Sequence, residues 1–180
     1  MARIMKTIAV LSLLFFILSL IVYREFPLPA LLSLCITLGT VSYHFWMRLG
    51  VGHFYDRFMQ NKADLSRNYW QLRPWEKKLY KKLEVKKWKG KMPSYDPGLF
   101  SPDAHSWEQI AQAMCQAELV HLSIIPLSFL PLLAAIFWGS FPVFFITSLC
   151  AAAFDALFVV MQRYNRPRIM RLVGKIDNPP

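Results

Sequence analysis

The chain has few of the residues from which disulfide frameworks and metal centres are built. Only three of its 180 residues are cysteine: Cys35, Cys115 and Cys150. An odd number without paired spacing argues against a disulfide framework, and free cysteines usually pack as small buried residues. The only histidines are His44, His53, His105 and His121. Because they lack the short repeated spacing of histidine-rich di-iron membrane enzymes, we expect no bound metal.

Charge is almost absent from four long stretches of the chain. The composition is 55% hydrophobic, yet the formal net charge is +10, so apolar and charged residues must be segregated. The stretches are residues 8–22, 27–47, 119–138 and 141–161. Each approaches or reaches the roughly 20 residues that a helix needs to cross a bilayer. The sequence therefore predicts an all-α, polytopic membrane protein with four transmembrane helices, not an ordinary soluble domain.

No small-residue cleavage site follows the first apolar stretch. Arg3 and Lys6 precede it, as in a signal peptide, but the residues after it are Tyr23, Arg24, Glu25 and Phe26. A second apolar stretch begins at once. We therefore expect an uncleaved membrane anchor.

Lysine and arginine are concentrated outside the apolar stretches. Thirteen of the 21 lie between Arg48 and Lys91, and both ends of the chain are basic, whereas the short turns near residues 24 and 139 are not. The positive-inside rule then places both termini and residues 48–117 in the cytoplasm, at the cell membrane. The predicted organisation is a hairpin (1–47), a basic cytoplasmic segment (48–117), a second hairpin (118–162) and a basic tail (163–180).

The basic segment is expected to contain an amphipathic helix. Leu72, Trp75, Leu79 and Leu83 recur at helical spacing with lysines between them, and residues 73–91 carry nine positive and two negative side chains. Such a helix should lie on the membrane surface and bind anionic lipids. The aromatic residues are not at base-stacking spacing, so nucleic acid is not an expected partner.

Glu118 and His121 stand out where the third apolar stretch begins. Ser106 and Gln109 form a capping-box pattern that starts a helix running into this stretch. Residues three apart on a helix are neighbours. A carboxylate beside an imidazole can fix one tautomer and make the free nitrogen a better general base. The alternative, a Glu–His pair that only solvates the end of the helix, remains open.

Asp155 is a carboxylate inside the fourth apolar stretch. It lies seven residues before Gln162, so Asp155, Gln162 and Arg166 can form a polar stripe that points inward. An intramembrane carboxylate is costly without a partner. We expect Asp155 to be paired or protonated and to line a cavity.

Prolines are expected to distort the last two transmembrane helices. Pro126 and Pro131 should kink the third helix. Pro167 should end the fourth helix near Asn165 or Arg166, because a residue before proline avoids the helical conformation. The run around it, residues 162–168 (Gln-Arg-Tyr-Asn-Arg-Pro-Arg), offers more directed hydrogen bonding than membrane anchoring requires and indicates a headgroup or substrate site.

Three motifs resemble one family of enzymes. Residues 85–89 (Val-Lys-Lys-Trp-Lys), 116–121 (Gln-Ala-Glu-Leu-Val-His) and above all 162–168 are similar to the glycosyl-4,4'-diaponeurosporenoate acyltransferases, over roughly residues 69–175. This resemblance implies transfer of a fatty acyl group to a hydroxyl of the glucose on a glycosylated apocarotenoid, the last step of staphyloxanthin-type carotenoid synthesis. The hairpin 1–47 is longer than the single anchor usual in that family, and relatives with these motifs can be expected to acylate other glycolipids.

Resemblance and residues together predict acyl transfer at the cytoplasmic face of the membrane. His121 would be the general base, Glu118 would orient it, and Asn165 or Gln162 would donate to the oxyanion. The residues expected to bind substrate are Gln162, Arg163, Tyr164, Arg166, Arg168, Asp155, Lys87, Trp88 and Lys89. The expected partners are membrane lipids, a glycosylated lipid acceptor and an acyl donor, either acyl-coenzyme A, acyl carrier protein or phospholipid; no further cofactor is expected.

Three alternatives remain at this level. A covalent acyl-enzyme through Cys115 ranks below direct transfer, because no histidine is visibly paired with this thiol. A non-enzymatic four-helix membrane adaptor or lipid-binding subunit would also use the basic segment. A small transporter would explain Asp155, although the chain has no internal repeat.

Overall fold

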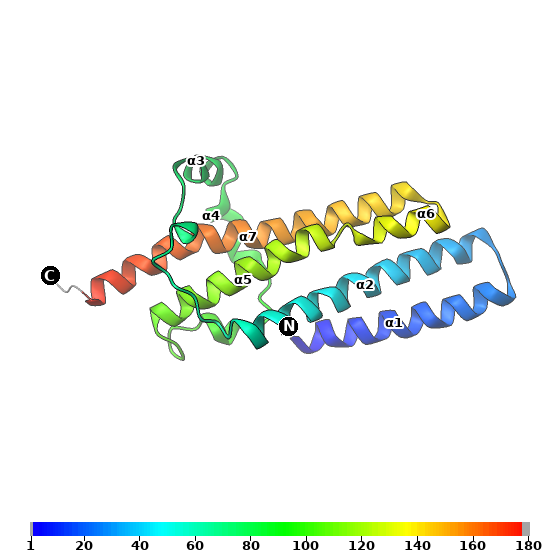
Figure 1. The fold of residues 1–180 in the computed structure, drawn as a ribbon, viewed down its shortest axis with the longest axis horizontal. Coiled ribbons are helices and arrows are strands. Elements are labelled where there is room, and N and C mark those ends of the chain that lie inside the picture. Colours follow the sequence, from blue (N-terminus) through cyan, green and yellow to red (C-terminus); the bar gives the residue numbers. More distant parts are fainter. Residues whose placement is uncertain (1, 178–180) are drawn as a thin grey trace. The chain divides into compact units, whose positions relative to one another are not determined.

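The computed structural model describes residues 2–177, with side chains to residue 174, and this part of the chain is helical without β-strands. Figure 1 shows four long helices, α1 (Ala2–Glu25), α2 (Pro29–Phe58), α5 (Trp107–Leu127) and α7 (Phe141–Asp177). Between α2 and α5 lie the short elements η1 (Asn68–Trp70), α3 (Pro74–Lys82), α4 (Val85–Trp88), η2 (Lys89–Lys91) and η3 (Pro97–Phe100). Between α5 and α7 lie η4 (Leu130–Ala134) and α6 (Ala135–Trp138). The all-α prediction is confirmed.

Four helical segments are long and apolar enough to span a membrane. They are Ala2–Glu25, Pro29–Phe58, Trp107–Trp138 and Phe141–Gly174. Their large apolar side chains, such as Leu14, Phe15 and Ile21, are mostly exposed instead of packed inside the protein. A surface of this kind suits hydrocarbon, so the four predicted transmembrane helices are confirmed as structural elements.

The chain forms two compact units. The first contains residues up to 52 together with 124–153, and the second contains residues 53–123 together with the chain from 154 onward. Helices α2, α5 and α7 each contribute residues to both units. The four-part division predicted above follows membrane topology and stays a prediction, and residues 178–180 of its basic tail lie outside the described residues.

Within the first unit, α1 and α2 form a close hairpin. The Trp46 Nε1–H donates to the carbonyl of Ala9 at 3.1 Å. Gly39 lets Phe16 approach, since a Cβ at residue 39 would lie 2.9 Å from the ring. Small residues at such contacts allow helices in membranes to pack closely.

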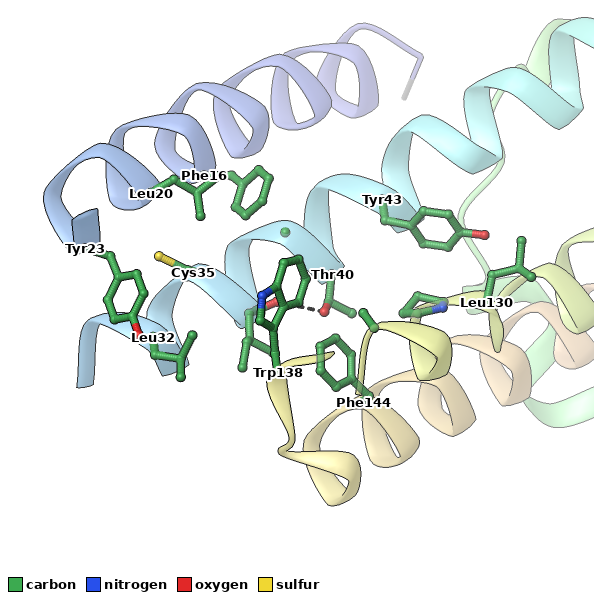
Figure 2. Close-up of a pocket in the computed structure, with 14 residues that line it drawn as sticks. Phe16, Leu20, Tyr23, Leu32, Cys35, Thr40, Tyr43, Leu130, Trp138 and Phe144 are labelled. Carbon is green, nitrogen blue, oxygen red and sulfur yellow. Dashed lines mark hydrogen bonds between the residues drawn. The ribbon is translucent and has the colours of Figure 1, made fainter. Parts of the chain in front are cut away.

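A pocket of about 270 Å³ in the first unit is lined almost entirely by carbon (Figure 2). Two of its polar side chains bond to backbone carbonyls. The Thr40 hydroxyl donates to the carbonyl of Ile36 at 2.7 Å, and the Tyr43 hydroxyl donates to the carbonyl of Leu127 at 2.7 Å. The pocket therefore offers mainly apolar surface, and neither a histidine nor a carboxylate lines it.

The third span is interrupted where the sequence predicts kinks. Helix α5 ends at Leu127, one residue after Pro126, and continues as η4, which contains Pro131, and α6. Pro131 has no N–H to offer the carbonyl of Leu127 four residues earlier. That carbonyl instead accepts the Tyr43 hydroxyl. The interruption is thus tolerated because a neighbouring helix supplies the missing donor.

The prediction that Pro167 ends the last helix is wrong. Helix α7 contains Pro167 and continues to Asp177. Around the proline, the Arg168 guanidinium donates to the carbonyl of Tyr164 at 2.6 Å. Arg163 and Arg166 also tie this turn to other elements of the second unit. These contacts outweigh the local preference against a helix before proline.

Candidate active site

The candidate site lies in the second unit, where α5 is fixed against the end of α2. The predicted capping box is confirmed: the Ser106 backbone N–H donates to Gln109 Oε1 at 2.9 Å, and the Gln109 N–H donates to Ser106 Oγ at 3.2 Å. About two turns after Gln109, the Gln116 Nε2 donates to Asp56 Oδ1 at 2.7 Å and its Oε1 accepts the Asn61 N–H at 2.6 Å. These bonds set the position of the motif 116–121.

Glu118 is fully buried and pairs with two arginines of α7. Its Oε1 accepts from Arg163 Nη1 at 2.7 Å and its Oε2 accepts from Arg166 Nη1 at 2.5 Å. Arg166 is itself only 2% exposed. The predicted pairing of Glu118 with His121 is therefore wrong, because a buried carboxylate takes the strongest cationic donors available, and α7 supplies two.

Glu76 of α3 completes this cluster. Arg163 donates to it in a bidentate manner, from Nε to Oε1 at 2.5 Å and from Nη2 to Oε2 at 3.0 Å. Glu76 also accepts the Arg73 backbone N–H at 2.7 Å and the Tyr80 hydroxyl at 2.9 Å. Helix α3 is thus attached to α7 by its polar side. This role was not predictable from the sequence, where Glu76 is only one negative charge among lysines.

The apolar side chains of α3 remain exposed. Trp75 and Leu79 of the helix, and Leu83 directly after it, are exposed, whereas the buried residues of the helix are Glu76 and Tyr80. The predicted amphipathic helix is confirmed as a helix with an uncovered apolar face. Its location on the membrane surface stays a prediction, which this exposure supports.

The ionised state of Glu76 should make the fold sensitive to acid. Burial of the carboxyl raises its pKa, but hydrogen bonds from Arg163, the Arg73 backbone and Tyr80 outweigh burial and hold the pKa of Glu76 below its ordinary value of 4.5. A carboxyl whose pKa is lower in the folded than in the unfolded state stabilises the fold above the unfolded pKa. That contribution is lost as pH falls through the lowered value.

We expect Glu76→Gln to have a lower Tm than wild type at pH 7. This difference in Tm should shrink progressively below about pH 4.5, because wild type then loses the contribution of the ionised carboxylate. The measurement is thermal unfolding of the detergent-solubilised protein between pH 7 and pH 3. Other carboxyls titrate in both proteins, so the difference between the two curves isolates Glu76. A gap that stays constant down to pH 3 would contradict the assignment.

Arg163 and Arg166 also bind the backbone of residues 69–71. Arg163 donates to the carbonyls of Tyr69 and Gln71, each at 3.3 Å. Arg166 donates to the carbonyl of Trp70 at 3.0 and 3.3 Å and lies 5.0 Å from the centre of the Trp70 ring. The two guanidinium groups that were expected to bind substrate therefore bind carboxylates and carbonyls of the protein itself.

His121 pairs with Asp155. Its Nδ1 lies 2.8 Å from Asp155 Oδ1, and the two side chains are 21% and 1% exposed. The imidazole stacks on Phe158, with centroids 4.4 Å apart and planes 6° apart. Nδ1–H donating to the carboxylate leaves Nε2 as the acceptor, and Nε2 makes no hydrogen bond within the described part of the chain. This tautomer is the one a general base requires.

The predicted inward stripe of α7 is confirmed. Asp155, Gln162 and Arg166 are all buried. Gln162 follows Phe158 by four residues, so the two share a helix face. Among residues 2–177 the Gln162 amide has no hydrogen-bond partner, which leaves both its donor and its acceptor for a bound molecule.

The three predicted binding residues of the motif 85–89 make different contacts in the structure. Lys89 reaches α7, where its Nζ donates to Asn165 Oδ1 at 2.5 Å. Lys87 instead pairs with Glu84 at 2.5 Å in an exposed position, and the Trp88 Nε1–H donates to the carbonyl of Leu83 at 2.9 Å. Of the three predicted residues, only Lys89 joins the motif 162–168.

Cys115 is fully buried in α5. An acyl group on its thiol would have to occupy closely packed interior. The geometry thus favours direct transfer over the acyl-enzyme alternative.

Comparison with known protein families gives a match that covers the candidate site. The family model of the glycosyl-4,4'-diaponeurosporenoate acyltransferases matches residues 66–175, which is more than half of the chain and includes every residue of the site from Glu76 to Arg168. Searches of curated proteins and of solved structures found no match. The chain belongs to the glycosyl-4,4'-diaponeurosporenoate acyltransferase family.

Proposed function

We propose that the chain is an O-acyltransferase that moves a fatty acyl group to a hydroxyl of a glycosylated lipid at the cytoplasmic face of the membrane. Family membership supports the acyltransferase class and a glycosyl diaponeurosporenoate, or a related glycolipid, as acceptor. Four apolar helices support the membrane location. The observation that carries the proposal is the His121–Asp155 pair with an unoccupied Nε2.

In this mechanism His121 Nε2 removes the proton of the acceptor hydroxyl. Asp155 holds Nδ1–H and stabilises the imidazolium that forms. The hydroxyl oxygen attacks the acyl carbonyl carbon and forms a tetrahedral intermediate. As that intermediate collapses, the bond to the donor's leaving group breaks and His121 returns the proton to the leaving group.

Amide side chains of α7 can stabilise the oxyanion. The Gln162 amide is unengaged among the described residues. The Asn165 Oδ1 is occupied by Lys89, so Asn165 presents its Nδ2 as a donor. Preorganised donors of this kind contribute most when they aim at developing charge. In this proposal Glu118, Arg163 and Arg166 are positioning residues that hold α7 against α5.

The test is a transfer assay on purified protein in detergent micelles. Radiolabelled acyl-coenzyme A, acyl carrier protein and acyl phospholipid are each incubated with a glycolipid extract that includes glycosyl apocarotenoids. We expect a labelled glycolipid from at least one donor, and mild alkali should release the label as free fatty acid because the new bond is an ester. Heat-denatured protein is the control. Binding of glycolipid without any transfer from the three donors would instead support the adaptor alternative.

A further inference from the structure

The cations around residues 162–168 of α7 form two groups, and within the described residues one group has carboxylate partners and the other has none. Arg163 and Arg166 are matched by Glu76 and Glu118. Lys89 and Arg168 instead approach the ring of Tyr164, with Lys89 Nζ 5.2 Å and Arg168 Cζ 3.8 Å from its centroid.

No carboxylate pairs with Lys89 or Arg168 in the part of the chain that the structure describes. Their polar contacts are neutral: Lys89 donates to Asn165 Oδ1, and Arg168 donates to the carbonyl of Tyr164. The nearby Lys87 differs, since Glu84 neutralises it. The contrast identifies a local excess of positive charge beside the motif 162–168.

Burial and neighbouring positive charge both disfavour the charged form of Lys89. Burial, followed by the positive charges of Arg168 and Lys86, lowers the pKa of Lys89 below its ordinary value. A bound anion would relieve this repulsion and favour the charged lysine. The arrangement therefore favours binding of an anion beside Lys89 and Arg168.

The same face of α7 links this group to His121. Phe158, which stacks on His121, and Asn165, which accepts from Lys89, are seven residues apart and lie on one side of the helix. At 1.5 Å per residue their separation along the axis is about 10 Å. Gln162 lies between them. A molecule held by its anionic group at Lys89 could thus extend along this face to the imidazole.

We propose that Lys89, held by Asn165, and Arg168 bind a phosphate group of the acyl donor. The planar guanidinium of Arg168 and the ammonium of Lys89 provide charge-assisted donors, which suit phosphate oxygens. Phospholipids and coenzyme A both carry such a group. The role in donor binding rests on the proposed acyltransferase function, whereas the phosphate site itself does not.

The experiment is equilibrium binding to purified protein in uncharged detergent, which needs no turnover. The probes are dihexanoyl phosphatidylglycerol and coenzyme A. We expect wild type to bind at least one probe, and Lys89→Ala and Arg168→Gln each to weaken that binding about tenfold or more, since hydrogen bonds to charged groups are the strong ones. Binding of the lipid alone assigns a phospholipid donor, and binding of coenzyme A alone assigns a thioester donor.

Two controls separate the site from general basicity and from misfolding. Lys91→Ala removes an exposed lysine of the same basic stretch and should leave affinity unchanged. Lys89→Arg keeps the charge and should retain binding. Equal affinity of wild type and both site variants, or no binding of either probe by wild type, would overturn the proposal. If the site variants lose binding but wild type shows no acyl transfer, the phosphate site is upheld and the proposed function is rejected.

Discussion

Replacing His121 with alanine is expected to reduce acyl transfer by about 10²- to 10⁴-fold without unfolding the protein. The imidazole is the group that would take the acceptor's proton, and an alanine side chain offers no atom that could replace it. The side chain is partly exposed, so its removal leaves no sealed cavity. The measurement is kcat at saturating donor and acceptor, together with the thermal unfolding of each variant.

Asp155→Asn should reproduce much of this loss, because an amide cannot stabilise the imidazolium and can favour the wrong tautomer. His105→Ala is the matched control. His105 lies in the loop before α5, where the structure shows only its backbone N–H bonded to Ser101, so this variant should keep wild-type turnover. Near wild-type turnover in His121→Ala would remove His121 as the base.

The features of this protein that could be predicted from the sequence are those set by residues close together in the chain. Long charge-free stretches can satisfy their backbone in hydrocarbon only as helices, so the number of spans follows directly from the sequence. The start of α5 was predictable for a similar reason. Ser106 and Gln109 form a capping box from residues that are close in the chain.

The partners of the buried carboxylates were not predictable from local spacing. Glu118 and His121 are neighbours on one helix, but their hydrogen bonds cross to another helix. Glu118 accepts from Arg163 and Arg166. His121 pairs with Asp155, 34 residues away in the chain. Helical spacing shows which side chains share a face and says nothing of what another helix brings to it. The one available signal was the cost of leaving Asp155 unpaired within an apolar stretch.

Removing the carboxylate of Glu118 should destabilise the fold by about 3–5 kcal/mol, the usual effect of breaking a buried ion pair by deleting one partner. In Glu118→Leu, the buried Arg166 and the partly buried Arg163 lose their shared counter-charge. The double variant Glu118→Leu/Arg166→Met should recover part of the loss, since an apolar pair of similar volume can replace a buried ion pair. Thermal and denaturant unfolding in detergent micelles measures both effects.

A variant of Glu118 can also distinguish a positioning role from a catalytic role. If Glu118 acts only by holding α7 against α5, Glu118→Gln should lower the folded fraction while each folded molecule retains its transfer activity, because Gln keeps the shape and some hydrogen bonds of the carboxylate. Activity is therefore normalised to the folded fraction measured in the same sample. A Glu118→Gln variant that unfolds like wild type but transfers no acyl group would show that the carboxylate takes part in the reaction and that Asp155 alone does not account for the basicity of His121.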